Sequence, residues 1–166
     1  SDVCSSDLEA ATLEPLHEHL FEYKTHMMQN YGAGVQACYR GPRLYDTPET
    51  QAAVTEVIQW YKKYRDILNS DMIHLRRPDA RDWDGFIHVN PHKKEKGLAM
   101  FFNPTHQEIT RTIHIPLYYT GLTQTARIRE KEQKPVTYKL NRNYTVELTV
   151  KIPANGYTWY VVEAAD

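Results

Sequence analysis

The spacing of apolar residues changes at about residue 70, and this change most constrains the fold. Before it, apolar residues recur every three or four positions, which is typical of helices. After it, apolar and polar residues alternate, which is typical of strands with one wet face. The clearest alternation has these residues facing inward: Tyr144, Val146, Leu148, Val150 and Ile152. The sequence therefore predicts a helical first part and a second part built of strands.

Eight segments of the second part have strand character. They are spaced about 8–12 residues apart and have no helical stretch between them, as in a β-sandwich. About 97 residues are enough for a two-layer core of that kind. The segments are residues 72–75, 85–89, 98–102, 109–117, 126–129, 136–140, 144–152 and 157–162. We therefore predict an antiparallel β-sandwich over residues 70–166.

The first part predicts two helices separated by a short buried strand at residues 35–39. The first helix begins near Thr12 and ends at Asn30-Tyr31-Gly32. The second begins at Thr47-Pro48 and ends at Asn69-Ser70. The face expected to be buried in the second helix consists of Val54, Val57, Ile58, Tyr61, Arg65 and Leu68.

A single buried strand cannot satisfy its own backbone and needs neighbours on both sides. Those neighbours are missing between residues 9 and 69, so we interpret this part as the end of a larger α/β domain. The most economical arrangement is the last helix, strand and helix of a (β/α)₈ barrel. The predicted fold class is therefore an α+β fragment, with the terminal helix-strand-helix of a (β/α)₈ barrel followed by an antiparallel β-sandwich.

Residues 1–8 have no apolar periodicity and lack the basic start and apolar centre of a signal peptide. Residues 4–8 resemble a translated sequencing adapter, a scar found at the ends of assembled metagenomic genes. We interpret this octapeptide as an artefact or a disordered tail. The true start of the gene is then expected to be missing, so the sequence predicts no compartment, and a secreted or periplasmic parent is compatible with it.

Composition excludes several classes of protein. Twenty basic and twenty-one acidic side chains give a net charge of −1, without the basic excess that a nucleic-acid-binding protein would usually show. No apolar run approaches the roughly 18–20 residues of a membrane helix. We therefore expect neither a nucleic acid nor a membrane as partner, and the sequence leaves the oligomeric state open.

Six segments resemble the C-terminal region of barrel-type glycoside hydrolases, in the style of the α-galactosidases. In that region a last barrel helix runs into a β-sandwich, and one sandwich strand is an apolar run ending in Asn-Pro, here Asn103-Pro104. The segments are residues 34–41, 60–68, 73–79, 97–104, 117–122 and 152–157. The resemblance covers nearly the whole chain after Leu8.

The resemblance implies a parent enzyme that cleaves oligo- or polysaccharides with two carboxylates at the ends of earlier barrel strands. Those strands are not in this sequence, so no catalytic residue is assigned. The fragment itself is expected to be inactive, with the sandwich as a non-catalytic accessory domain and the carbohydrate substrate bound through the missing barrel. The alternatives are a carbohydrate-binding module and a purely structural sandwich.

The loop after the predicted strand at residues 35–39 would lie at the active-site end of a barrel. Its tyrosines can stack on a pyranose face and its arginines can donate hydrogen bonds to hydroxyls. We therefore predict a substrate-binding group of Tyr39, Arg40, Arg43 and Tyr45. The alternative is structural, with Arg40 and Asp46 forming ion pairs or capping the next helix.

Several other side chains could in principle form a metal site or act as a nucleophile. The residues His17, His19, Glu22 and His26 lack the spacing of a zinc protease motif and are interpreted as a solvated helix face. Cys38 is interpreted as a small core residue. The sequence thus predicts no metal and no cofactor.

Three aromatic residues of the predicted sandwich have two possible roles. Trp83 and the pair Tyr118-Tyr119 can form stacking surfaces for sugars. The favoured interpretation places Trp83 at the junction of barrel and sandwich, and the tyrosine pair in the core or between domains.

Overall fold

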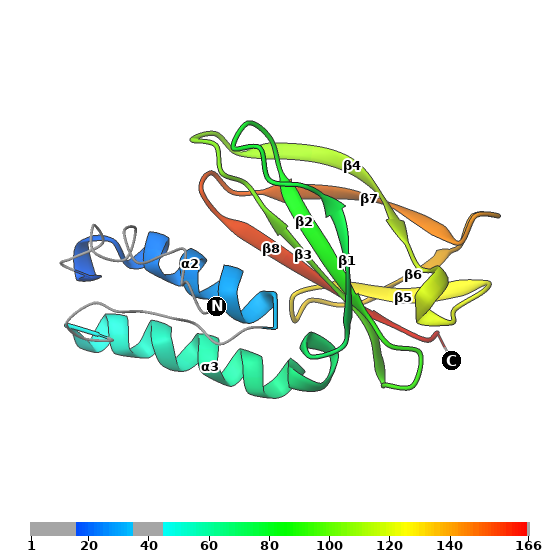
Figure 1. The fold of residues 1–166 in the computed structure, drawn as a ribbon, viewed down its shortest axis with the longest axis horizontal. Coiled ribbons are helices and arrows are strands. Elements are labelled where there is room, and N and C mark those ends of the chain that lie inside the picture. Colours follow the sequence, from blue (N-terminus) through cyan, green and yellow to red (C-terminus); the bar gives the residue numbers. More distant parts are fainter. Residues whose placement is uncertain (1–15, 35–44, 166) are drawn as a thin grey trace, which may run out of the picture. The chain divides into compact units, whose positions relative to one another are not determined.

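The computed structural model describes residues 16–34 and 45–165. The chain divides into two compact units, Ser1–Arg65 and Asp66–Asp166, and each unit is considered separately. Helices come first and eight antiparallel strands follow, which confirms the predicted α+β fold class (Figure 1). The predicted strand at residues 35–39, with Cys38, and the octapeptide at residues 1–8 lie outside the described residues.

The described part of the first unit consists of helices. A short 3₁₀ helix, η1 (Leu16–Glu18), precedes α2 (Leu20–Gly32), and α3 (Pro48–Leu68) follows. Pro48 begins α3, as predicted, because the first helical position needs no backbone donor. Just before it, the Thr47 and Thr50 backbone N–H groups donate to each other's hydroxyl oxygens, at 2.9 Å and 3.3 Å. This reciprocal capping fixes the start of α3.

The buried face of α3 differs from the predicted one at its C-terminal end. Val54, Val57 and Leu68 are buried, as expected. Arg65 is exposed, however, and Tyr64 is buried in its place with only 2% of its surface accessible. Both positions fit a helical repeat from Val57, and burial of the tyrosine ring is favourable whereas burial of a guanidinium is costly.

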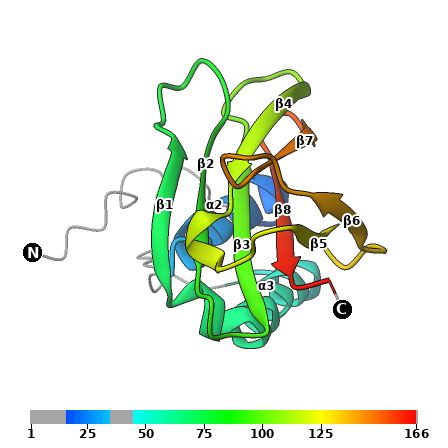
Figure 2. The same ribbon diagram turned by 90° about the vertical axis from the view of Figure 1, so that its right-hand side faces the viewer.

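The second unit contains eight strands in two sheets, and each predicted strand is confirmed to within a few residues. The strands are β1 (Asp71–Arg76), β2 (Asp84–Val89), β3 (Glu95–Phe102), β4 (Ile109–Pro116), β5 (Thr125–Glu130), β6 (Val136–Lys139), β7 (Thr145–Ile152) and β8 (Tyr157–Glu163). One sheet has the order β1-β2-β3-β8-β5-β6, and the other pairs β4 with β7 (Figures 1 and 2). All pairings are antiparallel.

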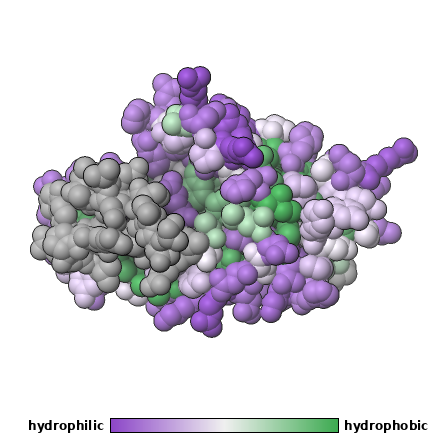
Figure 3. All heavy atoms as spheres, in the orientation of Figure 1, coloured by the Kyte–Doolittle hydropathy of each residue, from purple (hydrophilic) through white to green (hydrophobic). Residues whose placement is uncertain are grey.

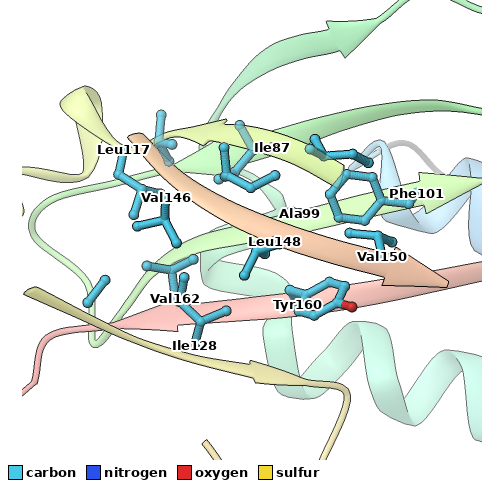
Figure 4. Packing of buried hydrophobic residues seen from close by; sticks show 14 of the residues in the cluster. Ile87, Ala99, Phe101, Leu117, Ile128, Val146, Leu148, Val150, Tyr160 and Val162 are labelled. Atoms are coloured by element: carbon cyan, nitrogen blue, oxygen red, sulfur yellow. The ribbon is translucent and has the colours of Figure 1, made fainter. Parts of the chain in front are cut away.

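The core of the sandwich lies between the two sheets. From β7, the alternate residues Val146, Leu148, Val150 and Ile152 are buried, as the sequence pattern predicts. In Figure 4, Val146, Leu148 and Val150 point toward residues of the larger sheet such as Phe101. The polar residues between them face water. This alternation is what allows a two-stranded sheet to cover a six-stranded one.

The central strands of the larger sheet are apolar on their second face as well. Phe86, Leu98, Met100, Phe102 and Trp159 alternate with the core residues along β2, β3 and β8, and all five are buried. A sheet with two apolar faces is built to be covered on both sides. On the side of the molecule seen in Figure 3, hydrophilic residues border a hydrophobic patch over the strands.

Within residues 16–34 and 45–165, no helix is long and apolar enough to cross a bilayer.

Asn103, at the end of β3, joins three separate parts of the sandwich. Its side chain is buried, and its amide nitrogen donates to the carbonyl oxygens of Gln107 at 2.7 Å and Ile152 at 3.2 Å. Its carbonyl oxygen accepts from the Thr105 backbone N–H at 2.9 Å, and its own backbone N–H donates to Gly156 at 2.9 Å. These bonds give a physical reason for the Asn-Pro that ends this strand.

We predict that Asn103→Ala destabilises the protein by about 1–3 kcal/mol, because it removes the buried amide that donates to the Ile152 carbonyl. Urea unfolding followed by circular dichroism measures the change. Asn143→Ala is the control, since Asn143 is exposed and its loss is expected to cost less than about 0.5 kcal/mol. Equal stability of the two variants would contradict the role assigned to Asn103.

Candidate functional site

The predicted substrate-binding loop is described only at its end. Tyr39, Arg40 and Arg43 lie outside the described residues. Tyr45 is described and its side chain is 45% exposed, just before α3. An exposed tyrosine at this position is available to stack on a ligand. The role of the four residues in substrate binding stays a prediction.

The next residue, Asp46, forms a compact hydrogen-bonded group with His17 and Thr50. Its Oδ2 lies 2.6 Å from His17 Nδ1 and accepts the His17 backbone N–H at 3.0 Å. Its Oδ1 accepts the Thr50 hydroxyl at 3.0 Å. The carboxylate is 5% exposed, whereas the His17 ring is 49% exposed. The group therefore ties η1 to the start of α3 and holds an imidazole at the surface.

Two effects compete at the Asp46 carboxyl. Burial alone raises its pKa, but the hydrogen bonds from His17 and Thr50 outweigh burial and lower the pKa to about 2. Asp46 is thus a carboxylate at neutral pH and orients the imidazole. Of the two structural roles considered for Asp46, the structure shows a side-chain pair, with His17, that holds η1 to the start of α3. The cap of α3 is formed by Thr47 and Thr50.

The remaining charged residues of α2 do not gather into a metal site. His19 Nδ1 lies 3.6 Å from Glu22 Oε2, one turn along the helix. Within the described ranges, no group of three or more metal-ligating side chains is present.

The loop between β1 and β2 is a second candidate, because it combines a tryptophan with several charges. Arg76 donates to Asp79 at 2.8 Å, which holds the pKa of Asp79 well below its usual range. Arg76 also donates to the Trp83 carbonyl at 2.6 Å. The Trp83 ring is half-buried and meets the Phe101 ring edge-on at 5.8 Å. Trp83 therefore packs on the core of the sandwich, and its expected position at the junction of barrel and sandwich stays a prediction.

Asp84, the first residue of β2, is the one carboxyl of this loop with a raised pKa. Burial, opposed by Arg76 and assisted by Asp79, raises the pKa of Asp84 to about 6. A raised pKa in a carboxyl is a common sign of a functional site, but structural burial produces it as well. We interpret the raised pKa of Asp84 as a consequence of its burial at the start of β2.

The pair Tyr118-Tyr119 lies in η2 (Tyr118–Thr120), the short helical turn after β4. Their side chains are 62% and 63% exposed, so they do not lie in the core of the sandwich, whereas the alternative of packing between domains stays a prediction. The sequence pattern misleads because the preceding Leu117 takes the buried position that ends the strand alternation.

Comparison with known proteins supports the fold. No protein-family model and no curated protein matches the chain. Among solved structures, a GH27 β-L-arabinopyranosidase from Geobacillus stearothermophilus matches with a TM-score of 0.57 at 12% identity. The match covers 88% of this chain and 31% of that one.

Two further structures share the fold. Alpha-galactosidase I from Mortierella vinacea has a TM-score of 0.55 at 14% identity, with 87% of this chain and 36% of that chain covered. An α-amylase from Geobacillus thermoleovorans has a TM-score of 0.58 at 14% identity, with coverage of 87% and 33%. The chain thus spans about a third of the length of these proteins and has the fold of that part. The resemblance to α-galactosidase-like enzymes is confirmed at the level of fold.

We predict that His17→Ala raises the pKa of Asp46 above 2, because the hydrogen bonds that oppose the effect of burial are then reduced. Titration of the Asp46 carboxyl carbon by NMR measures this change. Glu18→Ala is the matched control, since Glu18 lies 3.9 Å from His17 Nε2 but is not among the groups that shift the pKa of Asp46. An Asp46 pKa that stays near 2 in the His17 variant would show that the pair does not hold the carboxylate.

We also predict that Asp84→Asn stabilises the protein at pH 7. The folded-state pKa of about 6 exceeds the ordinary value of 3.8, so the native state loses stability as pH rises from about 4 to above 6. The advantage of the asparagine variant should therefore vanish near pH 3.5. Thermal unfolding at both pH values measures it, with the exposed Asp71→Asn as control. A variant that is less stable than wild type at pH 7 would refute the assignment.

Proposed function

We propose that this chain is the C-terminal part of a glycoside hydrolase that acts on oligo- or polysaccharides. Residues 9–69 would be the last helix, strand and helix of a (β/α)₈ barrel, and residues 70–166 a C-terminal sandwich domain. The observation that carries the proposal is the fold. It matches about a third of the length of solved structures that are named as an arabinopyranosidase, an α-galactosidase and an α-amylase. The order of elements, two helices and then eight strands, agrees with it.

The proposed role of the sandwich is accessory and non-catalytic. Support comes from the larger sheet, whose central strands are apolar on both faces, as in a domain that stabilises a larger assembly. Further support comes from the three carboxyls with shifted pKa values. Asp46 and Asp79 are held by hydrogen bonds from neighbouring side chains, and Asp84 is shifted mainly by burial. Asp84 lies near enough to Asp79 for that carboxylate to raise its pKa, but Asp79 is held by Arg76, so we do not assign these two as the carboxyl pair of glycoside hydrolysis.

The proposal names the reaction class, O-glycosyl hydrolysis, and assigns no sugar. Structures named as an arabinopyranosidase, an α-galactosidase and an α-amylase share this fold, so the fold does not select a linkage. In the parent enzyme, Tyr39, Arg40, Arg43 and Tyr45 would lie near the substrate, because loops after barrel strands form the active-site end.

We predict that the 166-residue chain shows no turnover of aryl α-galactosides, β-L-arabinopyranosides or α-maltosides above the buffer blank, because the catalytic carboxylates belong to other strands. Release of nitrophenol followed by absorbance measures this. Robust turnover would refute the assignment as an inactive fragment.

The matched positive control is the product of the complete gene from the same locus. Its upstream reading frame is expected to encode the preceding β/α units with two carboxylates at strand ends, and that product should hydrolyse at least one of the three substrates. A frame without such units would overturn the proposed function itself.

A further inference from the structure

Three tyrosines form an exposed cluster at one end of the sandwich. The rings of Tyr118 and Tyr119 are 5.1 Å apart at an interplanar angle of 89°, and those of Tyr118 and Tyr144 are 5.5 Å apart at 69°. Tyr118 and Tyr119 are more than 60% exposed, and Tyr144 is half-buried. We call these three residues the tyrosine cluster. It lies where the yellow-green turn after β4 approaches the start of β7 in Figure 1.

The backbone beneath the tyrosine cluster is firmly fixed. Leu117 and Thr120, on either side of the pair, are completely buried. The Leu117 backbone N–H donates to the Tyr144 carbonyl at 2.9 Å, which joins η2 to the start of β7. Gly121 ends η2 in the left-handed conformation, with φ at 78°. Exposed rings on so fixed a base lose little conformational freedom when a ligand binds.

Tyr144 adds an independent observation. Its φ is +60°, in the left-handed region that a bulky residue adopts only at a cost. The residue before it, Asn143, is of a type that tolerates this conformation more readily. A strained backbone that places an aromatic ring beside two exposed rings points to a use for that ring.

The chemistry around the tyrosine cluster favours an uncharged ligand. Residues 115–126, which include Tyr118 and Tyr119, contain no charged side chain, although a quarter of the chain is charged. Beside Tyr144, Arg142 is the exposed charged residue. Thr123, Gln124, Asn141 and Asn143 are exposed nearby in sequence and offer hydrogen-bond donors and acceptors. Neutral aromatic faces beside amides and hydroxyls suit a pyranose ring, which has apolar C–H faces and a rim of hydroxyl groups.

We propose that the tyrosine cluster is a surface binding site for neutral oligosaccharide chains. The choice of ligand class rests on the proposed function, whereas the existence of the site rests on the exposure and geometry of the rings. The perpendicular pair presents one ring face and one ring edge, so a sugar would stack on a single tyrosine while its hydroxyls meet the neighbouring ring's hydroxyl and the amides. The site would hold a polymer to the sandwich without cleaving it.

Affinity electrophoresis of the full chain through gels that contain soluble starch or galactomannan tests the proposal. We expect at least one of the two polymers to retard the chain, and the double variant Tyr118→Ala/Tyr119→Ala to bind at least about tenfold more weakly. Phe21→Ala is the matched control, because Phe21 is a 50%-exposed aromatic on α2; its retardation should equal that of wild type. Tyr118→Phe/Tyr119→Phe should keep most of the retardation, since stacking needs the ring.

Three outcomes would overturn the proposal: no retardation by either polymer, retardation that survives the double alanine variant, or a self-association that the same variant abolishes while neither polymer binds. Sedimentation velocity detects the last, which would assign the surface to a second copy of the chain. Failure here leaves the proposed function intact, because that function is tested on the complete gene product. Binding by the cluster with no hydrolysis by that product would instead sink the proposed function alone.

Discussion

The contact between β7 and the larger sheet is the interaction on which the second unit depends. A two-stranded sheet is marginal in water by itself, so β4 and β7 persist only because their alternate apolar residues are buried. Leu148 and Val150 meet Phe101 and Tyr160 of the opposite sheet within one core (Figure 4). Tyr160 keeps its hydroxyl protonated there, since burial and the nearby Glu130 raise its pKa. The two sheets are therefore expected to fold and unfold cooperatively.

Polar contacts fix how the strands of the sandwich align with one another. Asn103 links the end of β3 to the end of β7 through its side-chain amide and to the turn before β8 through its backbone N–H, so one buried residue joins three chain segments. Within the same sheet, Arg129 and Glu163 form a largely buried ion pair at 3.0 Å between the neighbouring strands β5 and β8. Buried polar groups of this kind select one arrangement among several that apolar burial alone would accept. The apolar pattern stabilises the sandwich, and these polar groups select a single arrangement of its strands.

Local patterns predict most of this fold, and the exceptions have a common cause. All eight strands follow from alternation and turn residues, and the start of α3 follows from Thr47-Pro48, because these signals act over a few neighbouring residues. The division into sheets of six and two strands does not follow, nor does the pairing of His17 with Asp46, which are separated by 29 positions. Nor does the exposure of Tyr118 and Tyr119, which depends on Leu117 taking the last inward position. Contacts between distant segments leave no periodic trace in one sequence.

Enzymes named for different sugars share this fold, so the fold itself does not determine which sugar such an enzyme acts on. Val150, Asn103 and Phe101 serve folding, and their chemistry is committed to the interior. Specific behaviour must then come from exposed groups whose loss costs the fold little, such as Tyr45 in the first unit and the tyrosine cluster in the second. The strained φ of Tyr144 fits this division, because a position selected for stability alone would favour asparagine or glycine there. Function in this chain is therefore to be sought where the structure departs from what folding requires.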